Sequence, residues 1–163
     1  MKIRSASLND IAQISELEEA IEKENAASSK TIFSRLKMFP EGFLVAKEKN
    51  RVVGYLESCL WDKNNFETFN EIKDFPKNHN QNSKTLYIIF LAVAEDQRRK
   101  EVGSELVKTI IGSAKNYKLE KVQLVAGEGF LVDFYRGLGF QAIRSLPNFL
   151  PYSSGTLMEN YLK

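Results

Sequence analysis

The sequence of 163 residues contains one cysteine, Cys59, and one histidine, His79. A single cysteine excludes an internal disulfide, and a single histidine leaves few ligands for a zinc site. No apolar run reaches the ~18–20 residues that a membrane span needs, and residues 1–5 lack the apolar core of a signal peptide. We therefore expect a cytoplasmic protein that binds no metal and no membrane.

Neither sign of charge prevails in the sequence. There are 23 Lys and Arg residues against 21 Asp and Glu, a formal net charge of +2. A nucleic-acid-binding domain usually carries a strongly basic patch, so we expect no nucleic-acid partner. Hydrophobic residues make up 43% of the chain and charged residues 27%, which is typical of a globular protein. The length fits one domain, and we expect residues 1–163 to form it.

Hydrophobic periodicity predicts a mixed α/β fold. The strands are expected at residues 2–6, 43–47, 52–61, 85–93, 122–126, 140–146 and 156–162, and the helices at 8–21, 32–39, 102–117 and 131–136. In the first helix a core stripe is expected at Leu8, Ile11, Ile14, Leu17 and Ile21, with the acidic residues on the other side. The alternation of strand and helix over 85–136 predicts a parallel pair of strands joined by a crossover. Residues 62–84 show little periodicity and are expected to form a long loop, either functional or passive.

Two short segments carry the candidate chemistry. Residues 97–104 read QRRKEVGS between a buried strand and a helix, where unpaired amides and a partial positive charge receive phosphates. Alone, this basic segment is also typical of a solvated surface. Residues 133–140 read DFYRGLGF, a short helix that ends at Gly137 or Gly139. Its tyrosine, Tyr135, is equally typical of a core aromatic residue.

Taken together, the two segments resemble the GNAT superfamily of acyl-CoA-dependent N-acetyltransferases. Residues 98–104 resemble its phosphate-loop pattern R/Q-x-x-G-x-G/A, and residues 135–140 resemble its Y-x-x-x-G-F element. Residues 40–41, 60–63, 91–93 and 128–140 are similar to the arylalkylamine (serotonin-type) N-acetyltransferases. The resemblance implies a mixed sheet of about six to seven strands, splayed between the fourth and fifth, with about four flanking helices.

The resemblance also implies a reaction and its partners. An acetyl group would pass from acetyl-CoA, the cosubstrate, to a primary amine by direct attack in a ternary complex. The amine would be a small aryl or alkyl amine, and related enzymes often form homodimers. An amine with a pKa near 10.4 is only about one part in a thousand neutral near pH 7, so a group or a water chain must receive a proton.

Three residues are the catalytic candidates. By resemblance, Tyr135 donates a proton to the leaving CoA thiolate. Glu57 is the candidate base, acting through water that Tyr87 anchors; a solvent-facing carboxylate is the other interpretation of Glu57, and His79 is less favoured. The residues expected to bind the cofactor are Leu91, Ala92, Val93, Arg98, Arg99, Lys100, Glu101, Val102, Gly103, Ser104, Glu128, Phe134 and Tyr135.

The sequence departs from the family in three places. Glu101 stands where the phosphate motif has its first glycine, and we expect its carboxylate to point into solvent. Tyr87 and Ile89 stand where the vertebrate arylalkylamine enzymes have two histidines. The acceptor-binding segment is short around residues 25–30. These departures concern cofactor affinity, the proton route and the acceptor, respectively.

Aromatic residues are expected to line an acceptor pocket with an acidic spot for a cation. They are Phe33, Phe43, Tyr55, Trp61, Phe66, Phe69 and Tyr152. Four alternatives stay open at this point: a CoA-binding regulator without turnover, an acetyltransferase for a protein or peptide amine, a nucleic-acid module that uses Arg98, Arg99 and Lys100, and a nucleophile at Cys59.

Overall fold

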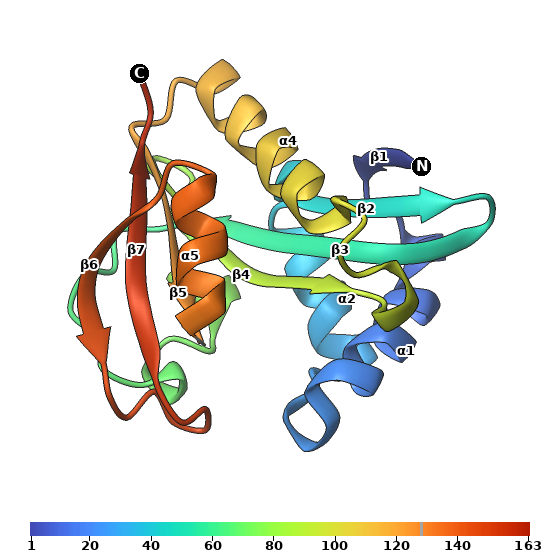
Figure 1. Cartoon of the computed structure of the whole chain (residues 1–163), viewed down its shortest axis with the longest axis horizontal. Helices are drawn as coiled ribbons and strands as arrows, with labels where there is room; N and C mark the ends of the chain where they lie inside the picture. Colours follow the sequence, from blue (N-terminus) through green and yellow to red (C-terminus); the bar gives the residue numbers. More distant parts are fainter. Residues whose placement is uncertain (128) are drawn as a thin grey trace. The chain divides into compact units, whose positions relative to one another are not determined.

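The computed structural model describes residues 1–127 and 129–163 (Figure 1). The strands are β1 (Lys2–Ser5), β2 (Phe43–Glu48), β3 (Arg51–Leu60), β4 (Thr85–Val93), β5 (Lys121–Ala126), β6 (Gln141–Leu146) and β7 (Gly155–Tyr161). The helices are α1 (Ile11–Glu22), α2 (Ser29–Met38), α3 (Phe75–Asn78), α4 (Val102–Asn116) and α5 (Gly129–Gly137). Each predicted strand and helix is present within a few residues of its expected position.

The sheet has seven strands in the order β1-β2-β3-β4-β5-β7-β6. β4 and β5 pair in parallel, from Thr85 opposite Lys121 to Tyr87 opposite Gln123. The pairs β1–β2, β2–β3, β5–β7 and β6–β7 are antiparallel. The predicted mixed sheet and its parallel pair are therefore confirmed, while the splay between β4 and β5 stays a prediction. The described residues form five helices rather than about four, because α3 was not expected.

Two compact units make up the chain. The first unit comprises Met1–Ser58 and Ile89–Ile110, and the second comprises Cys59–Ile88 and Ile111–Lys163. β3, β4 and α4 each contribute residues to both units. The expectation of a single domain stays a prediction.

The core of the first unit lies between α1, α2 and the strands. Its fully buried members include Ile14 of α1, Ile32 of α2 and Val45 of β2. Successive side chains of β3 point to opposite faces of the sheet. Tyr55 joins this core, and a Cβ on Gly54 would stand only 3.0 Å from the side chain of Val102 in α4. Glycine at position 54 therefore allows the first turn of α4 to approach the strand closely.

The second unit contains an aromatic core that corrects the expectation for residues 62–84. This segment holds a 3-10 turn at Phe69–Glu71 and the helix α3, and it buries Phe66, Ile72 and Phe75 completely or almost so. The indole of Trp61 packs against Phe66 and Phe75, with ring centroids 5.6 and 5.9 Å apart. The prediction of a loop without regular structure was wrong because contacts distant in sequence, rather than periodicity, order these residues.

β6 is the last strand in the order of the sheet. Its pairing with β7 shifts in register between Ala142 and Arg144. The guanidinium of Arg144 reaches back to the segment after β3. Its Nη1 donates to the Glu67 carboxylate at 2.8 Å, and its Nη2 donates to the carbonyl oxygens of Asn64 and Phe66. This side chain fixes residues 64–67 beside the edge strand.

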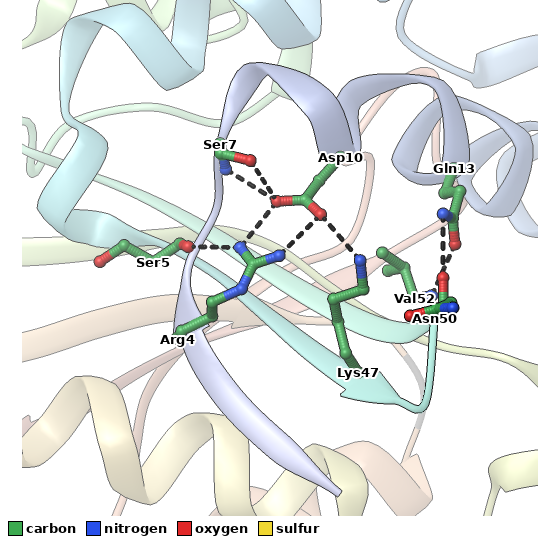
Figure 2. Close-up of polar contacts among 8 residues, drawn as sticks. All are labelled: Arg4, Ser5, Ser7, Asp10, Gln13, Lys47, Asn50 and Val52. Carbon is green, nitrogen blue, oxygen red and sulfur yellow. Dashed lines mark hydrogen bonds and ion pairs between the residues drawn. The ribbon is translucent and has the colours of Figure 1, made fainter.

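The start of α1 is fixed by Asp10, as Figure 2 shows. The buried Asp10 carboxylate accepts two hydrogen bonds from the Arg4 guanidinium, at 2.8 and 2.9 Å, and further bonds from the backbone N–H and hydroxyl of Ser7. Lys47 of β2 lies 3.4 Å from the same carboxylate. The 3-10 turn Leu8–Asp10 precedes α1, so Leu8 leaves the core stripe and is 60% exposed, contrary to expectation.

The substitution Asp10→Asn is expected to lower the free energy of unfolding by about 2 kcal/mol at pH 7, since charge-assisted hydrogen bonds are lost. Burial opposes ionisation of Asp10, yet the hydrogen bonds from Arg4 and Ser7 hold its pKa below the usual value. The wild type should therefore be more stable than Asp10→Asn at pH values above about 3.9, the pKa of an aspartate in the unfolded chain. This difference in the free energy of unfolding should shrink as the pH falls further. Urea denaturation at several pH values measures both effects.

The matched control is Asp96→Asn, which breaks an exposed bidentate pair with Arg51. Exposed pairs contribute little to stability, so this variant should unfold almost like the wild type. Equal losses in the two variants would contradict the role given to Asp10.

Candidate active site

The segment between β4 and α4 has the backbone of an anion-binding loop. A 3-10 turn at Glu95–Gln97 follows β4, and then Arg99 and Glu101 adopt φ of +62° and +63°. Left-handed residues are common in the backbone turns that bind anions, so this segment is a candidate anion site. Arg98, Arg99 and Lys100 are all exposed here. The predicted phosphate-binding residues thus lie together in one loop.

The first turn of α4 completes this loop. The first helical hydrogen bond runs from the N–H of Glu105 to the carbonyl oxygen of Glu101 at 2.9 Å, and the hydroxyl of Ser104 donates to the same oxygen. The amides of Val102, Gly103 and Ser104 precede the first helical bond and lack intrahelical acceptors. The N-terminus of a helix attracts negative charge, so the site fits a diphosphate.

Glu101 is exposed, as expected from the sequence. The pKa of Lys108, about two turns further along the chain, is raised mainly by the hydrogen bond that Lys108 donates to Glu105, and the negative charge of Glu101 adds to the rise. A left-handed residue with a Cβ is strained by roughly 1–2 kcal/mol. The glycine of the family motif is free of this strain, so Glu101 is a conformational departure as well as an electrostatic one.

The last residues of β4 lead directly into the loop. Ala92 is buried, and Leu91 and Val93 are half-buried. The N–H of Ala94 donates to the carbonyl oxygen of Val53 at 2.9 Å, which joins the end of β4 to β3. The Nε of Arg98 donates to the carbonyl oxygen of Val93 at 3.4 Å. These contacts hold residues 91–98 as a continuous support for the phosphate loop.

Glu57 is completely buried on β3, so the solvent-facing interpretation is wrong. Its Oε1 accepts a hydrogen bond from the Nη1 of Arg35 in α2 at 2.7 Å. Its Oε2 is buried without a hydrogen-bond partner among the described residues. Burial raises the pKa of Glu57 to about 7, with Arg35 opposing the rise and Glu18 adding to it. A carboxylate with this pKa can exchange a proton near neutral pH.

Glu18 and Arg35 are functional candidates that the sequence reasoning missed. Glu18 is fully buried on the core side of α1, where no acidic residue was expected. Its carboxylate accepts hydrogen bonds from the hydroxyl of Tyr55 and from the N–H of Ala27, the latter at 2.8 Å. The available signal was the position of Glu18 between Ile14 and Ile21, on the apolar side of a helix.

Tyr135 and Tyr87 both belong to the second unit, and both are buried. Burial raises the pKa of Tyr87, and the neighbouring Cys59, Tyr152 and Tyr135 raise it further. Burial likewise raises the pKa of Tyr135, whose ring contacts Phe134 at a centroid distance of 5.0 Å. Both phenols are therefore protonated at neutral pH.

The end of α5 positions Tyr135. Gly139 has a φ of +93°, and the N–H of Phe140 donates to the carbonyl oxygen of Tyr135 at 3.1 Å. This is a Schellman-type helix end, which confirms the glycine stop predicted from the sequence. The predicted cofactor residue Glu128 lies outside the described residues.

The structure buries most of the aromatic residues predicted to line an acceptor pocket, and the pocket itself stays a prediction. Phe43, Tyr55, Trp61 and Phe66 are at most 2% exposed and fill the cores of the two units, while Phe33 is 41% exposed. These rings pack against neighbouring elements as ordinary core residues do. The half-buried positions are Phe69 and Tyr152, whose rings lie 5.3 Å apart.

The single histidine and the single cysteine of the chain are both packed among neighbouring residues. The Nδ1 of His79 accepts a hydrogen bond from the N–H of Leu60 at 3.1 Å, and burial lowers its pKa. Cys59 is buried beside Tyr87. Within residues 1–127 and 129–163, no helix is long and apolar enough to cross a membrane.

Comparison with known proteins identifies the family. The model of the Acetyltransferase (GNAT) family matches residues 8–140, so the chain belongs to this family and is an acetyltransferase of the GNAT type. No curated protein sequence matches.

Several solved structures are similar to the chain. A GphF GNAT-like decarboxylase in complex with isobutyryl-CoA has a TM-score of 0.86 at 18% identity, with 100% of both chains covered. The protein smu.2055 from Streptococcus mutans UA159 has a TM-score of 0.73 at 28% identity, also over 100% of both chains. The ribosomal-protein-S18-alanine N-acetyltransferase from Escherichia coli has a TM-score of 0.74 at 14% identity, covering 99% of this chain and 94% of that one.

The substitution Glu101→Gly is expected to stabilise the chain by up to about 1 kcal/mol, because it removes left-handed strain. The exposed carboxylate should leave acetyl-CoA affinity within about threefold of the wild type, since solvent and salt screen its charge. Thermal unfolding and calorimetric titration measure the two effects. Lys118→Gly, at another left-handed residue (φ +56°), is the control for strain alone. A gain in affinity above about tenfold in Glu101→Gly would show that the carboxylate opposes the phosphates.

The substitution Glu57→Gln is expected to change the pH dependence of stability. The folded pKa of Glu57 lies above its unfolded value of 4.5, so the wild type should lose stability as the pH rises from 4.5 to about 7. The loss should reach about 3 kcal/mol relative to Glu57→Gln. Urea denaturation at pH 5, 6, 7 and 8 follows the difference, and a constant difference across that series would refute the raised pKa.

Proposed function

We propose that the chain transfers the acetyl group of acetyl-CoA to a primary amine by direct attack in a ternary complex. The observation that carries this proposal is the loop at residues 98–104, where left-handed backbone, exposed cations and the N-terminus of α4 form a site suited to a diphosphate. Acetyl-CoA supplies the activated thioester, and the backbone of Leu91, Ala92 and Val93 would hold its pantetheine arm.

Proton removal from the amine is the first task of the protein. Deprotonating an amine with a pKa near 10.4 costs roughly 4–5 kcal/mol near pH 7. We assign the proton to Glu57, whose pKa of about 7 lets the carboxylate accept it and return it to solvent within one turnover. The full burial of Glu57 is consistent with a relay through water rather than direct contact.

Proton donation to the leaving thiolate is the second task, which we assign to Tyr135. Its raised pKa keeps the hydroxyl protonated until negative charge develops on sulfur. Tyr87, whose pKa burial raises, would anchor the water through which Glu57 receives the proton of the amine. Phe134 packs against Tyr135 and would cover the thioester end of the cofactor.

The acceptor in this proposal is a small aryl or alkyl amine, as the arylalkylamine resemblance implies. Phe69 and Tyr152, both half-buried, are the remaining aromatic candidates for its binding site. The proposal also includes a cytoplasmic location and a homodimer.

A protein or peptide amine is the second candidate acceptor. The similarity to an enzyme named as a ribosomal-protein-S18-alanine N-acetyltransferase favours it. The fully buried positions of Trp61 and Phe66 weaken the case for a large aromatic pocket. Peptides therefore belong in any acceptor screen.

The decisive experiment measures CoA release with aryl amines, polyamines, amino acids and peptides. Tyr135→Phe is expected to keep the fold and acetyl-CoA affinity but to lower kcat on the order of 10²-fold, because the leaving thiolate loses its acid. Tyr117→Phe, on an exposed tyrosine after α4, is the matched control and should keep full activity.

Two results would contradict this proposal. Equal kcat values for Tyr135→Phe and the wild type would remove Tyr135 from the mechanism. Acetyl-CoA binding without CoA release for any amine would favour a regulator without turnover.

A further inference from the structure

In the first unit the carboxylates of Glu18 and Glu57 and the guanidinium of Arg35 are all buried, and the guanidinium pairs with Glu57. Glu18 and Glu57 are 0% and 1% exposed, and Arg35 is 4% exposed. Arg35 forms its ion pair with Glu57, and its guanidinium also lies 5.7 Å from the ring centroid of Phe90 in β4. With both carboxylates ionised, the group carries a net negative charge inside the core. Burying such a charge is costly, so one carboxylate favours its protonated form.

Glu18 has hydrogen-bond donors that suit an anion, whereas Glu57 does not satisfy both of its oxygens. The hydroxyl of Tyr55 and the N–H of Ala27 donate to the two oxygens of Glu18. Glu57 has Arg35 on one oxygen and no partner among the described residues on the other. Hydrogen bonds to a carboxylate favour its ionised form. Glu57 is therefore the less well compensated of the two carboxylates, and the exchangeable proton belongs on it.

The positions of Tyr55 and Glu57 on β3 also link the two carboxylates. Tyr55 and Glu57 are two residues apart on β3, so their side chains leave the same face of the strand. Glu18 meets Tyr55 from α1, and Arg35 meets Glu57 from α2. Across β2, Phe43 stands opposite Glu57. The charged and titratable groups around Glu57 are thus Glu18, Arg35 and Tyr55, with Glu22 acting on Tyr55.

We propose that Glu18 is a positioning residue for the reaction, whose buried carboxylate opposes ionisation of Glu57 and ties the α1–α2 connection to β3. This inference rests on the proposed function only in that Glu57 accepts the proton of the amine. One carboxylate performs both tasks, since its oxygens bind Tyr55 of β3 and Ala27 between α1 and α2. Removing its charge makes Glu57 ionise at a lower pH.

The test replaces Glu18 by glutamine and follows Glu57 directly. In chain labelled with carbon-13 at the glutamate carboxyl groups, NMR gives the titration midpoint of Glu57, identified by its loss in Glu57→Gln. Glu18→Gln is expected to lower this midpoint by about one pH unit. The acid limb of kcat/KM should move down by the same amount, about a tenfold gain in kcat/KM below the limb.

The matched control is Glu19→Gln, which removes an exposed carboxylate from the same helix and should move neither readout. An unchanged Glu57 midpoint in Glu18→Gln would overturn the inference. A lowered midpoint with an unmoved acid limb would instead remove Glu57 as the proton acceptor, which is a failure of the proposed function.

A measurement on the wild type covers the case in which Glu18→Gln does not fold. The same labelled spectra report both carboxyl groups between pH 4 and pH 9. Glu57 is expected to titrate near pH 7. A Glu57 midpoint near the ordinary value of a glutamate would overturn the inference.

Discussion

The buried hydrogen bond from Arg35 to the Glu57 carboxyl group is the interaction on which the first unit depends. Arg35 is the one cation among the charged residues that the described part of the chain buries. It joins α2 to β3, while Glu18 joins α1 to the same strand through Tyr55. Polar groups buried in this way are tolerated only when hydrogen bonds compensate them, so the two helices have little freedom to shift over the strands. The same balance of charges holds a proton that can leave near neutral pH.

Periodicity predicted the elements well where burial follows a regular pattern. β4 is buried over most of its length and α4 has one clear apolar stripe, and both have nearly the expected bounds. Periodicity failed for Glu18, because hydrogen bonds from Tyr55 and Ala27 allow a carboxylate on an apolar face. It also failed at residues 62–84, where packing against Trp61 gives order to an irregular sequence.

The candidate site could be predicted only in part, for a related reason. The loop at residues 98–104 was predicted from a sequence motif, and the structure adds its left-handed residues Arg99 and Glu101, while its binding role stays a prediction. The partners of Glu57 come from another helix, and no spacing along the chain reveals them. The aromatic pocket was over-predicted, since rings that line a pocket and rings that fill a core have the same side chains.

The irregular edge strand β6 has a consequence for how the chain behaves at high concentration. An edge strand offers unpaired N–H and C=O groups to any other extended chain, and regular edges promote fibrous aggregates. The shift in register near Arg144 interrupts the regular edge on which another strand could pair. The guanidinium also holds residues 64–67 alongside this edge. A single arginine at the rim thereby discourages intermolecular strand stacking, which would otherwise compete with folding during synthesis.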